Sequence, residues 1–475
     1  KLTTSMIEFV LNNKPIETQT SAGMTLLDFI RSTQSLKGTK IGCREGDCGA
    51  CTILIGSLDS QNQLTYKSIT SCISPLGNAH GRHIVTVEGI NLPDKLNTVQ
   101  IFLKEYNATQ CGFCTPGFVM SLVGLCLQKE YISETEALKA ISGNICRCTG
   151  YKSIERAAYA IYNKIIALPY ANRLQALVDG AYIPAYFLNV AKTLQQIKPR
   201  AFNTKNGTLV AGGTDLYVRQ ADILTENEVN LVAHKSTFTG ITFYKDRCII
   251  GAETTVADLY DNSAMNTYFP EIRNYLKLVS SEQIRNMATI AGNFVNASPI
   301  GDLTIFFIAL NATITLQNSK GTLRSILLKD FYKGYKTLDL KQDEHLVNVA
   351  FNVPTKKYKF NFEKVSKRTH LDIASVNAAV LVSVKNDIIS QMHLACGGVA
   401  PVPFYLKNTC AFLTGKPLNT DTLKEASLIL QDEIAPISDV RGNASYKRLL
   451  AQQLFYAHFI KLFPEKFKIL ELVNA

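Results

Sequence analysis

Four cysteines in the first part of the chain have the spacing of metal ligands. Cys43 and Cys48 enclose four residues, Cys48 and Cys51 enclose two, and Cys72 follows at a distance. This spacing is typical of thiolates that hold a [2Fe–2S] cluster. Zinc sites more often use pairs of cysteines two residues apart, which the first interval does not provide. Glycines within 42–51 would let the loop turn its backbone amides toward an anionic cluster. We therefore predict a [2Fe–2S] cluster on these four cysteines.

A second set of cysteines lies downstream, in two pairs that each come directly before a stretch with helical periodicity. Cys111 and Cys114 enclose two residues and precede Thr115 and Pro116, which fit a helix N-cap and the first helical position. Cys146 and Cys148 enclose one residue. Helix N-termini at both pairs would favour a negatively charged cluster. This spacing by itself leaves zinc open, but beside the first set a second [2Fe–2S] cluster is the simpler interpretation.

Length and composition place the chain among multidomain globular proteins. Its 475 residues predict three or four domains. The net charge of +11 is spread along the chain, so we interpret it as solubility rather than as a surface for an acidic partner, and no nucleic-acid motif accompanies it. No uninterrupted apolar stretch has the length of a membrane span, and the start does not resemble a signal peptide. Twelve cysteines in such a chain favour metal ligation in a reducing cytoplasm.

The elements that position the cysteines differ between the two sets. Apolar and polar residues alternate over 6–10 and 14–20 around a two-asparagine turn, which predicts a hairpin. A helix opened by Thr25 and further strands near 52–55 and 63–66 complete a small sheet that carries the first cysteine loop. The chain then changes to helical periodicity, so the second set is expected in a helical domain.

The residue pattern after position 165 predicts a linker and two further domains. Pro, Asn and Gly interrupt any periodicity in the linker. Strand-like patterns over 360–400 are followed by helical patterns over 421–432 and 444–461. The predicted boundaries are 1–90 for the small sheet, 91–165 for the helical domain, 166–183 for the linker, 184–355 for a third domain and 360–475 for the last.

Two glycine-containing segments of the third domain could bind a diphosphate. In the first, a short strand runs into Gly212-Gly213 and then a helix start, which would expose backbone amides. An ordinary turn is the alternative, and the three-glycine dinucleotide fingerprint is absent, so a Rossmann domain is not supported. In the second segment, 288–302, we predict a strand that meets Gly-Asn, and then a helix that begins at Ser298-Pro299 with Asp302 in its first turn.

Three motifs give the chain a family resemblance. Residues 42–51, 110–117 and 146–151 match the iron–sulfur module of the molybdenum hydroxylases, the family of xanthine dehydrogenase, aldehyde oxidase and carbon monoxide dehydrogenase. The resemblance implies that the cluster of the helical domain lies near a molybdopterin and the first cluster near a flavin. It also implies that Gln110 contacts a pterin held by a partner chain, although a loop or capping amide is an alternative for this residue.

The same resemblance implies FAD as the cofactor of the third domain. Both glycine-containing segments resemble the flavin-binding loops of the family, Asp302 would make a polar contact to FAD, and Lys407 would lie near the isoalloxazine. Helix capping is the alternative for Asp302, and a solvated surface lysine is the alternative for Lys407. The implied FAD-binding residues of the two segments are Leu209, Val210, Ala211, Gly212, Gly213, Thr214, Asp215 and Leu216, and Thr289, Ile290, Ala291, Gly292 and Asn293.

The implied fold class is α+β multidomain. It comprises a β-grasp ferredoxin-like domain, a helical-bundle [2Fe–2S] domain, a two-subdomain FAD-binding domain of the vanillyl-alcohol-oxidase type, and a C-terminal α+β flavoprotein domain, to which 368–376 and 397–401 correspond. The remaining cysteines are interpreted as buried thiols; these are Cys126, Cys248, Cys396 and Cys410.

The resemblance further implies an electron-transfer role without catalytic residues in this chain. The chain most resembles the fused iron–sulfur/FAD small subunit of the bacterial xanthine dehydrogenase type. It would pass electrons from a molybdenum-cofactor-binding large subunit through two [2Fe–2S] clusters to FAD and on to NAD⁺, in a hetero-oligomer such as a dimer of heterodimers. A nicotinate, another N-heterocycle or an aldehyde in place of the purine is the first alternative. A stand-alone iron–sulfur flavin reductase is the second, and a zinc-bearing structural protein is the third.

Overall fold

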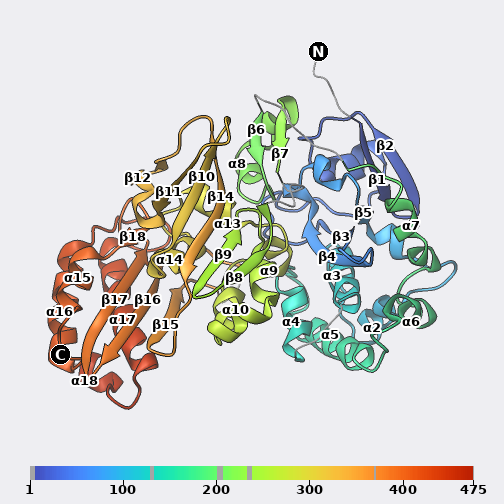
Figure 1. Cartoon of the computed structure of the whole chain (residues 1–475). Helices are drawn as coiled ribbons and strands as arrows, with labels where there is room; N and C mark the ends of the chain where they lie inside the picture. The colour runs from blue at the N-terminus through green and yellow to red at the C-terminus, as the bar shows by residue number, and fades with distance from the viewer. Residues whose placement is uncertain (1–5, 129–132, 200–206, 233–237, 369–370, 474–475) are drawn as a thin grey trace. The chain divides into compact units, whose positions relative to one another are not determined.

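The computed structural model describes residues 6–128, 133–199, 207–232, 238–368 and 371–473. The chain divides into two compact units, Lys1–Lys235 with Ser281–Ala288 and Ser236–Ser280 with Thr289–Ala475. Figure 1 shows the elements of both. Among the described residues, no helix combines the length and the apolar character that crossing a bilayer requires.

The first unit begins with a five-stranded sheet in the order β2-β1-β5-β3-β4. The predicted hairpin is confirmed, since β1 and β2 pair antiparallel on either side of Asn12, and β1 also pairs parallel with β5. Thr25 caps the short helix α1, which continues as a π-helical turn over Phe29–Thr33. The strands are β1 Ile7–Leu11, β2 Lys14–Thr18, β3 Thr52–Leu58, β4 Leu64–Thr70 and β5 His83–Val85, and α1 is Leu26–Asp28.

A helical part follows, seen in cyan and green in Figure 1. Helix α3 packs against β3, and its residues from Gly117 to Cys126 are all buried. A helix also forms inside the expected linker, where the Arg173 side chain donates to the carbonyls of Cys126 and Ile165. These contacts place α6 against the helical core. The helices are α2 Thr98–Glu105, α3 Thr115–Cys126, α4 Thr135–Ile141, α5 Lys152–Ile165, α6 Arg173–Asp179 and α7 Val190–Leu194.

The first unit is completed by a small parallel strand pair with its helices. Strand β6 leads through the Gly-Gly turn into α8, and β7 pairs parallel with β6. These elements are β6 Thr208–Val210, α8 Leu216–Glu226, β7 Val229–Leu231 and α12 Glu282–Arg285.

The second unit contains an antiparallel sheet in the order β11-β10-β14-β9-β8 and a small β12–β13 pair. The strands are β8 Ile241–Tyr244, β9 Arg247–Gly251, β10 Thr313–Asn318, β11 Leu323–Leu327, β12 Tyr332–Gly334, β13 Thr337–Leu338 and β14 Glu344–Asn352. The helices are α9 Val256–Asp261, α10 Ser263–Tyr268, α11 Ile272–Lys277, α13 Ile290–Asn296 and α14 Asp302–Ala309.

The second glycine-containing segment differs from the prediction at two points. Residues 290–296 form helix α13 rather than a strand, because Thr289 caps the helix by accepting the Gly292 N–H at 3.1 Å. Ile290 and Phe294, one helical turn apart, are both fully buried. The next helix, α14, begins at Asp302 and not at Ser298-Pro299.

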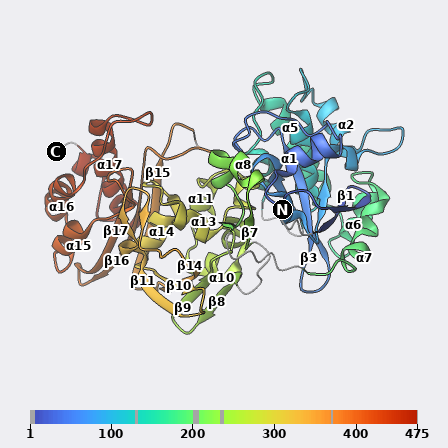
Figure 2. The ribbon, with the colours of Figure 1, turned by 90° about the horizontal axis from the view of Figure 1, so that it is seen from above.

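The C-terminal sheet β15-β16-β17-β18 is antiparallel and carries helices on both faces. Figure 2 shows α14 on one face of β16 and β17 and the helices α15 to α17 on the other. The predicted helices over 421–432 and 444–461 are confirmed. The elements are β15 Tyr358–Val365, β16 Val376–Lys385, β17 Ile388–Gly397, β18 Phe404–Tyr405, α15 Lys407–Leu413, α16 Thr420–Glu433, α17 Ala444–Leu462 and α18 Ile469–Val473.

Candidate redox-cofactor sites

The first cysteine loop turns backbone amides toward its own sulfur atoms. The Cys43 Sγ accepts hydrogen bonds from the backbone N–H groups of Glu45 and Cys48, both at 3.3 Å. The Cys48 Sγ accepts the N–H of Cys43 at 3.4 Å. Cys51, immediately before β3, and Cys72, two residues after the end of β4, are buried. Amide donors aimed at thiolate sulfur are what an anionic cluster requires.

The four thiols of this loop also hydrogen-bond one another. Hydrogen bonds from Cys48 and then Cys72 hold the pKa of Cys43 far below the ordinary thiol value. Cys43 beside it raises the pKa of Cys48, and Cys43 and Cys51 raise the pKa of Cys72, because a neighbouring thiolate favours the protonated thiol. The bond from Cys72 lowers the pKa of Cys51 despite burial. Cys43 therefore lies beside Cys48 and Cys72, and Cys72 lies beside Cys51, which fits four thiolate ligands of one cluster.

Close packing around this loop requires glycine at two positions. A Cβ atom at Gly42 would lie 2.5 Å from the Cys48 Sγ. Gly49 has a φ of +68°, and a Cβ there would lie 2.3 Å from the Gly143 carbonyl oxygen. Because Gly143 precedes the second cysteine pair of the helical part, the two cysteine loops are in direct contact.

The second cysteine set meets at the N-termini of α3 and α5. The thiols of Cys114 and Cys146 hydrogen-bond each other, and so do those of Cys111 and Cys148. Burial, followed by the bond to Cys146, raises the pKa of Cys114 to about 12. Thr149 donates its hydroxyl to the Cys146 Sγ at 3.2 Å. Cys111 and Cys148 are exposed. The arrangement fits a second four-thiolate cluster at the surface of the unit.

One local prediction at this site is wrong. The residue that precedes α3 is Cys114, and Thr115 is the first residue of the helix instead of its cap. The Thr115 hydroxyl hydrogen-bonds Thr109 at 2.7 Å and so does not cap the helix. Pro116 is consequently the second residue of the helix and not the predicted first, although it still lies in the first turn.

A buried polar network joins the two cysteine loops. The Ile145 N–H donates to the Cys48 carbonyl at 2.9 Å. Asn144, only 5% exposed, donates to the Gly49 carbonyl at 3.1 Å, and its Oδ1 accepts from Ser121 at 2.7 Å and from Gln283 at 3.0 Å. Sequence reasoning missed Asn144 and Gln283. Asn144 lies beside the ligand pair and could have been noticed, but nothing local points to Gln283, which is 139 residues away.

The first glycine-containing segment has backbone N–H groups without an acceptor in the described chain, at the turn from β6 into α8. The N–H groups of Gly212, Gly213 and Thr214 donate no hydrogen bond to the described part of the chain. Gly213 has a φ of +82°, and a Cβ at Gly212 would lie 1.9 Å from the Met287 carbonyl oxygen. Amides left free at a strand-to-helix turn fit an anionic diphosphate. Leu209 to Leu216 belong to the first unit, and Thr289 to Asn293 belong to the second.

The second segment uses its amides within the protein. The N–H groups of Ile290 and Ala291 donate to the carbonyls of Thr254 and Ala252, at 3.1 and 2.9 Å. The Asn293 Oδ1 accepts from both the backbone and the hydroxyl of Thr304. A contact from this segment to FAD would therefore involve side chains or carbonyl groups.

Asp302 forms a buried ion pair that the sequence did not predict. Its Oδ2 accepts from Lys364 Nζ at 2.7 Å, and its Oδ1 accepts from Asn377 at 2.6 Å. The side chains of Asp302 and Lys364 are 13% and 2% exposed. Lys364 also donates to the Leu278 carbonyl. Asp302 thus attaches the start of α14 to β15 and β16. By contrast, Lys407 is exposed on the first turn of α15.

Family models match the chain in four consecutive segments. A 2Fe-2S iron-sulfur cluster binding domain matches residues 9–76, and a [2Fe-2S] binding domain matches 86–159. An FAD binding domain in molybdopterin dehydrogenase matches 180–356, and a CO dehydrogenase flavoprotein C-terminal domain matches 361–462. These matches confirm the predicted fold class and show two [2Fe–2S] domains and an FAD-binding domain.

Individual relatives agree with these models. A xanthine dehydrogenase of Emericella nidulans is 30% identical, over 95% of this chain and 38% of that protein. Aldehyde oxidase 2 of Macaca fascicularis is 27% identical, over 99% of this chain and 40% of that protein. The chain therefore spans about two fifths of the length of these relatives. The crystal structure of a Cu,Mo-CO dehydrogenase matches with a TM-score of 0.50 and 26% identity, over 53% of this chain and 88% of that one. With its motifs, thiol sets and domain order taken together, the chain belongs to the molybdenum hydroxylase family and corresponds to the iron–sulfur and FAD portion of such an enzyme.

Proposed function

We propose that this chain is the electron-transfer portion of a xanthine dehydrogenase-type enzyme. It passes electrons from a molybdenum cofactor in a partner subunit through two [2Fe–2S] clusters to FAD and then to NAD⁺. When bound, the clusters exchange single electrons, whereas FAD collects two and can release a hydride. The observation that supports the proposal best is the direct contact of the two cysteine loops through Ile145 and Cys48. The proposed ligands are Cys43, Cys48, Cys51 and Cys72 for one cluster and Cys111, Cys114, Cys146 and Cys148 for the other.

The surface around the second cysteine set supports a protein partner there. Phe113, Ile145 and Tyr151 are 49%, 40% and 37% exposed beside the exposed ligands of that set. Large apolar side chains gathered around a redox site are typical of a surface that another protein covers. Gln110 is exposed next to Cys111, and we propose it as the pterin contact. The proposed assembly is a cytoplasmic hetero-oligomer, such as a dimer of heterodimers.

The substrate proposal depends on the relatives rather than on residues of this chain. The xanthine dehydrogenase match has the higher identity, and it favours a purine substrate. The aldehyde oxidase match covers nearly the whole chain and supports an aldehyde as the alternative. Nicotinate and other N-heterocycles are further alternatives, and the same assay tests them beside the aldehyde.

The test is to purify the tagged chain from its native source. A large co-purifying subunit that contains molybdenum, with NADH formed from NAD⁺ on addition of xanthine, is the expected result. NADH formation with an aldehyde or nicotinate instead of xanthine would select the alternative substrate. A monomer that oxidises NADH without any molybdenum subunit would contradict the proposal in favour of a stand-alone flavin reductase.

A further inference from the structure

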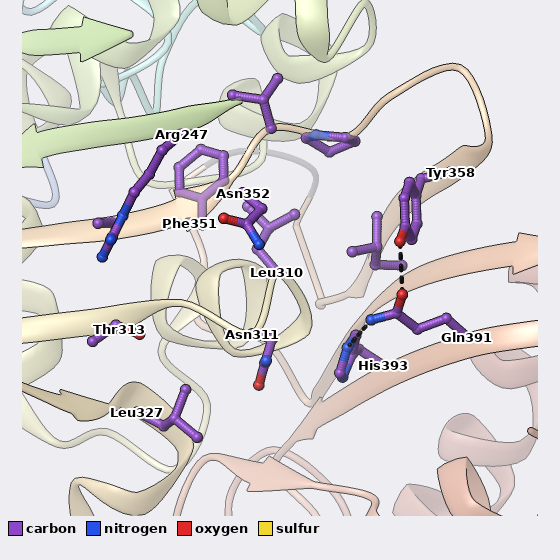
Figure 3. Close-up of a pocket in the computed structure, with 14 residues that line it drawn as sticks. Arg247, Leu310, Asn311, Thr313, Leu327, Phe351, Asn352, Tyr358, Gln391 and His393 are labelled. Carbon is purple, nitrogen blue, oxygen red and sulfur yellow. Dashed lines mark hydrogen bonds between the residues drawn. The ribbon is translucent and has the colours of Figure 1, made fainter. Parts of the chain in front are cut away.

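A polar pocket lies within the second unit, away from the residues discussed above. It has a volume of about 290 Å³, opens to the surface, and is lined by residues at the ends of β9, β14 and α14 and by residues of β15 and β17. Figure 3 shows Arg247 and Thr313 on one side, Gln391 and His393 on the other, and Asn311 and Asn352 between them. The volume is close to the lower limit of small-molecule sites.

Several polar groups of this pocket have unused hydrogen-bonding capacity. The side chains of Arg247, Asn311 and Asn352 form no hydrogen bond or ion pair with the described part of the chain, and the Asn311 Oδ1 is buried without a partner. Arg247 is the only Asp, Glu, Lys or Arg among the described residues that line the pocket. A guanidinium with free amide donors, unaccompanied by a carboxylate, favours an anionic group.

The opposite wall is held in place by a chain of hydrogen bonds, two of which are drawn in Figure 3. Tyr358 donates to the Gln391 Oε1 at 2.7 Å, and the Gln391 amide lies 3.1 Å from the His393 Nε2. His393 Nδ1 lies 2.9 Å from the Tyr405 hydroxyl. Because the Gln391 amide nitrogen can only donate, His393 accepts at Nε2 and donates from Nδ1, which makes it the neutral form. Burial and the nearby Lys329 lower the pKa of His393 in agreement with this.

The helix end at the pocket does not cancel the positive charge. Helix α14 ends at Ala309, and a helix C-terminus carries partial negative charge. The carbonyls of Ile308 and Phe307 are occupied by the N–H groups of Asn311 and Ala312, at 2.9 and 3.1 Å. The full charge of Arg247 therefore dominates the electrostatics of the pocket.

The apolar residues that line the pocket favour a ligand with an apolar part. Leu310, Phe351 and Leu381 are buried and line the pocket with apolar surface. A free inorganic anion would leave this surface uncovered, whereas an aromatic or aliphatic body would cover it. We propose that this pocket binds a small organic anion, a carboxylate or a phosphate monoester on an apolar body, with Arg247 on the anionic group.

The test measures binding by calorimetry to the purified, cofactor-loaded chain. The probes are benzoate and phenyl phosphate, with benzamide as the neutral isostere and inorganic phosphate as the anionic group alone. We expect at least one of the two organic anions to bind, and to bind about tenfold or more tightly than benzamide and inorganic phosphate, because a charge-assisted bond adds to apolar burial. Which of the two binds more tightly identifies the anionic group.

The variant that tests the site is Arg247→Gln, and Lys245→Gln is its matched control. Both residues are exposed; Lys245 lies in the turn between β8 and β9, Arg247 is the first residue of β9, and only Arg247 lines the pocket. Arg247→Gln should weaken binding about tenfold or more, whereas Lys245→Gln should leave it unchanged. The proposal is overturned if neither anion binds, if benzamide binds as tightly, or if Arg247→Gln binds like the unmodified chain. Circular dichroism confirms that each variant is folded.

Discussion

The buried ion pair between Lys364 and Asp302 allows a quantitative test of the second unit. Lys364→Met keeps an unbranched side chain that is one atom shorter and removes the charge that balances the Asp302 carboxylate. Within the described residues, that carboxylate then retains only its hydrogen bond from Asn377. Removing one partner of a buried pair costs about 3–5 kcal/mol, because the remaining charge stays desolvated without compensation. We expect the low end of this range, since Asp302 keeps a 13% exposed side chain and one hydrogen bond.

The matched control is Lys333→Met, which breaks an exposed pair. Lys333 Nζ lies 3.4 Å from the Asp339 carboxylate, and the two side chains are 53% and 32% exposed. Such surface pairs contribute about 0–1 kcal/mol. Stability is measured by urea denaturation followed by circular dichroism. Hydrogen exchange of β15 and β16 identifies the transition that belongs to this unit, since a multidomain chain does not unfold in two states.

A double variant separates the cost of the unpaired charge from other effects. Lys364→Met combined with Asp302→Leu removes both charges and should recover most of the stability that Lys364→Met loses. A Lys364→Met cost no larger than that of Lys333→Met, or a double variant less stable than Lys364→Met, would contradict a stabilising role of this buried pair.

Further predictions concern the clusters, their connection, FAD and pH. Cys148→Ser should abolish one of the two reduced-cluster signals in electron paramagnetic resonance and leave FAD bound. The control Cys248→Ala, which changes a buried thiol, should keep both signals. Loss of FAD from Cys148→Ser with all iron retained would contradict the domain assignment. Asn144→Leu leaves buried partners of Asn144 unsatisfied and should destabilise the first unit by about 2–4 kcal/mol, with both cluster signals perturbed; an unchanged unfolding midpoint would count against the network. Asp302→Asn should weaken FAD binding more than Lys333→Met does, as measured by flavin fluorescence. His83 is fully buried, and burial lowers its pKa from 6.5 to about 4, so the unfolded chain binds the extra proton between these values. The free energy of unfolding should therefore be at its full value above pH 6.5 and fall by about 3 kcal/mol as the pH drops toward 4. His83→Gln should flatten this pH dependence, and an unchanged dependence in that variant would contradict the prediction.

The cofactor content could be predicted from sequence because its signals are local. Each cysteine pair lies in one loop, and the distance between two thiolates that share a metal site is set by the few residues between them. The β1–β2 hairpin and helices α16 and α17 followed from periodicity for the same reason. The start of α13 could not be predicted in this way, because a short run such as Thr-Ile-Ala fits a strand as well as a capped helix. The burial of Ile290 and Phe294 on one face shows that the segment is a helix.

The family, the order of the domains and the two sets of cysteines could thus be read from the order of the residues. Which distant groups support the domains and the cysteines became visible only in the folded chain. Gln283 reaches Asn144 across 139 residues, and Lys364 reaches Asp302 across 62. Neither pair has a local signature, because a buried polar group takes whichever partner the packing brings within hydrogen-bond distance. The pocket at Arg247 was also visible only in the folded chain, since its walls come from strands and a helix that no spacing in the sequence connects.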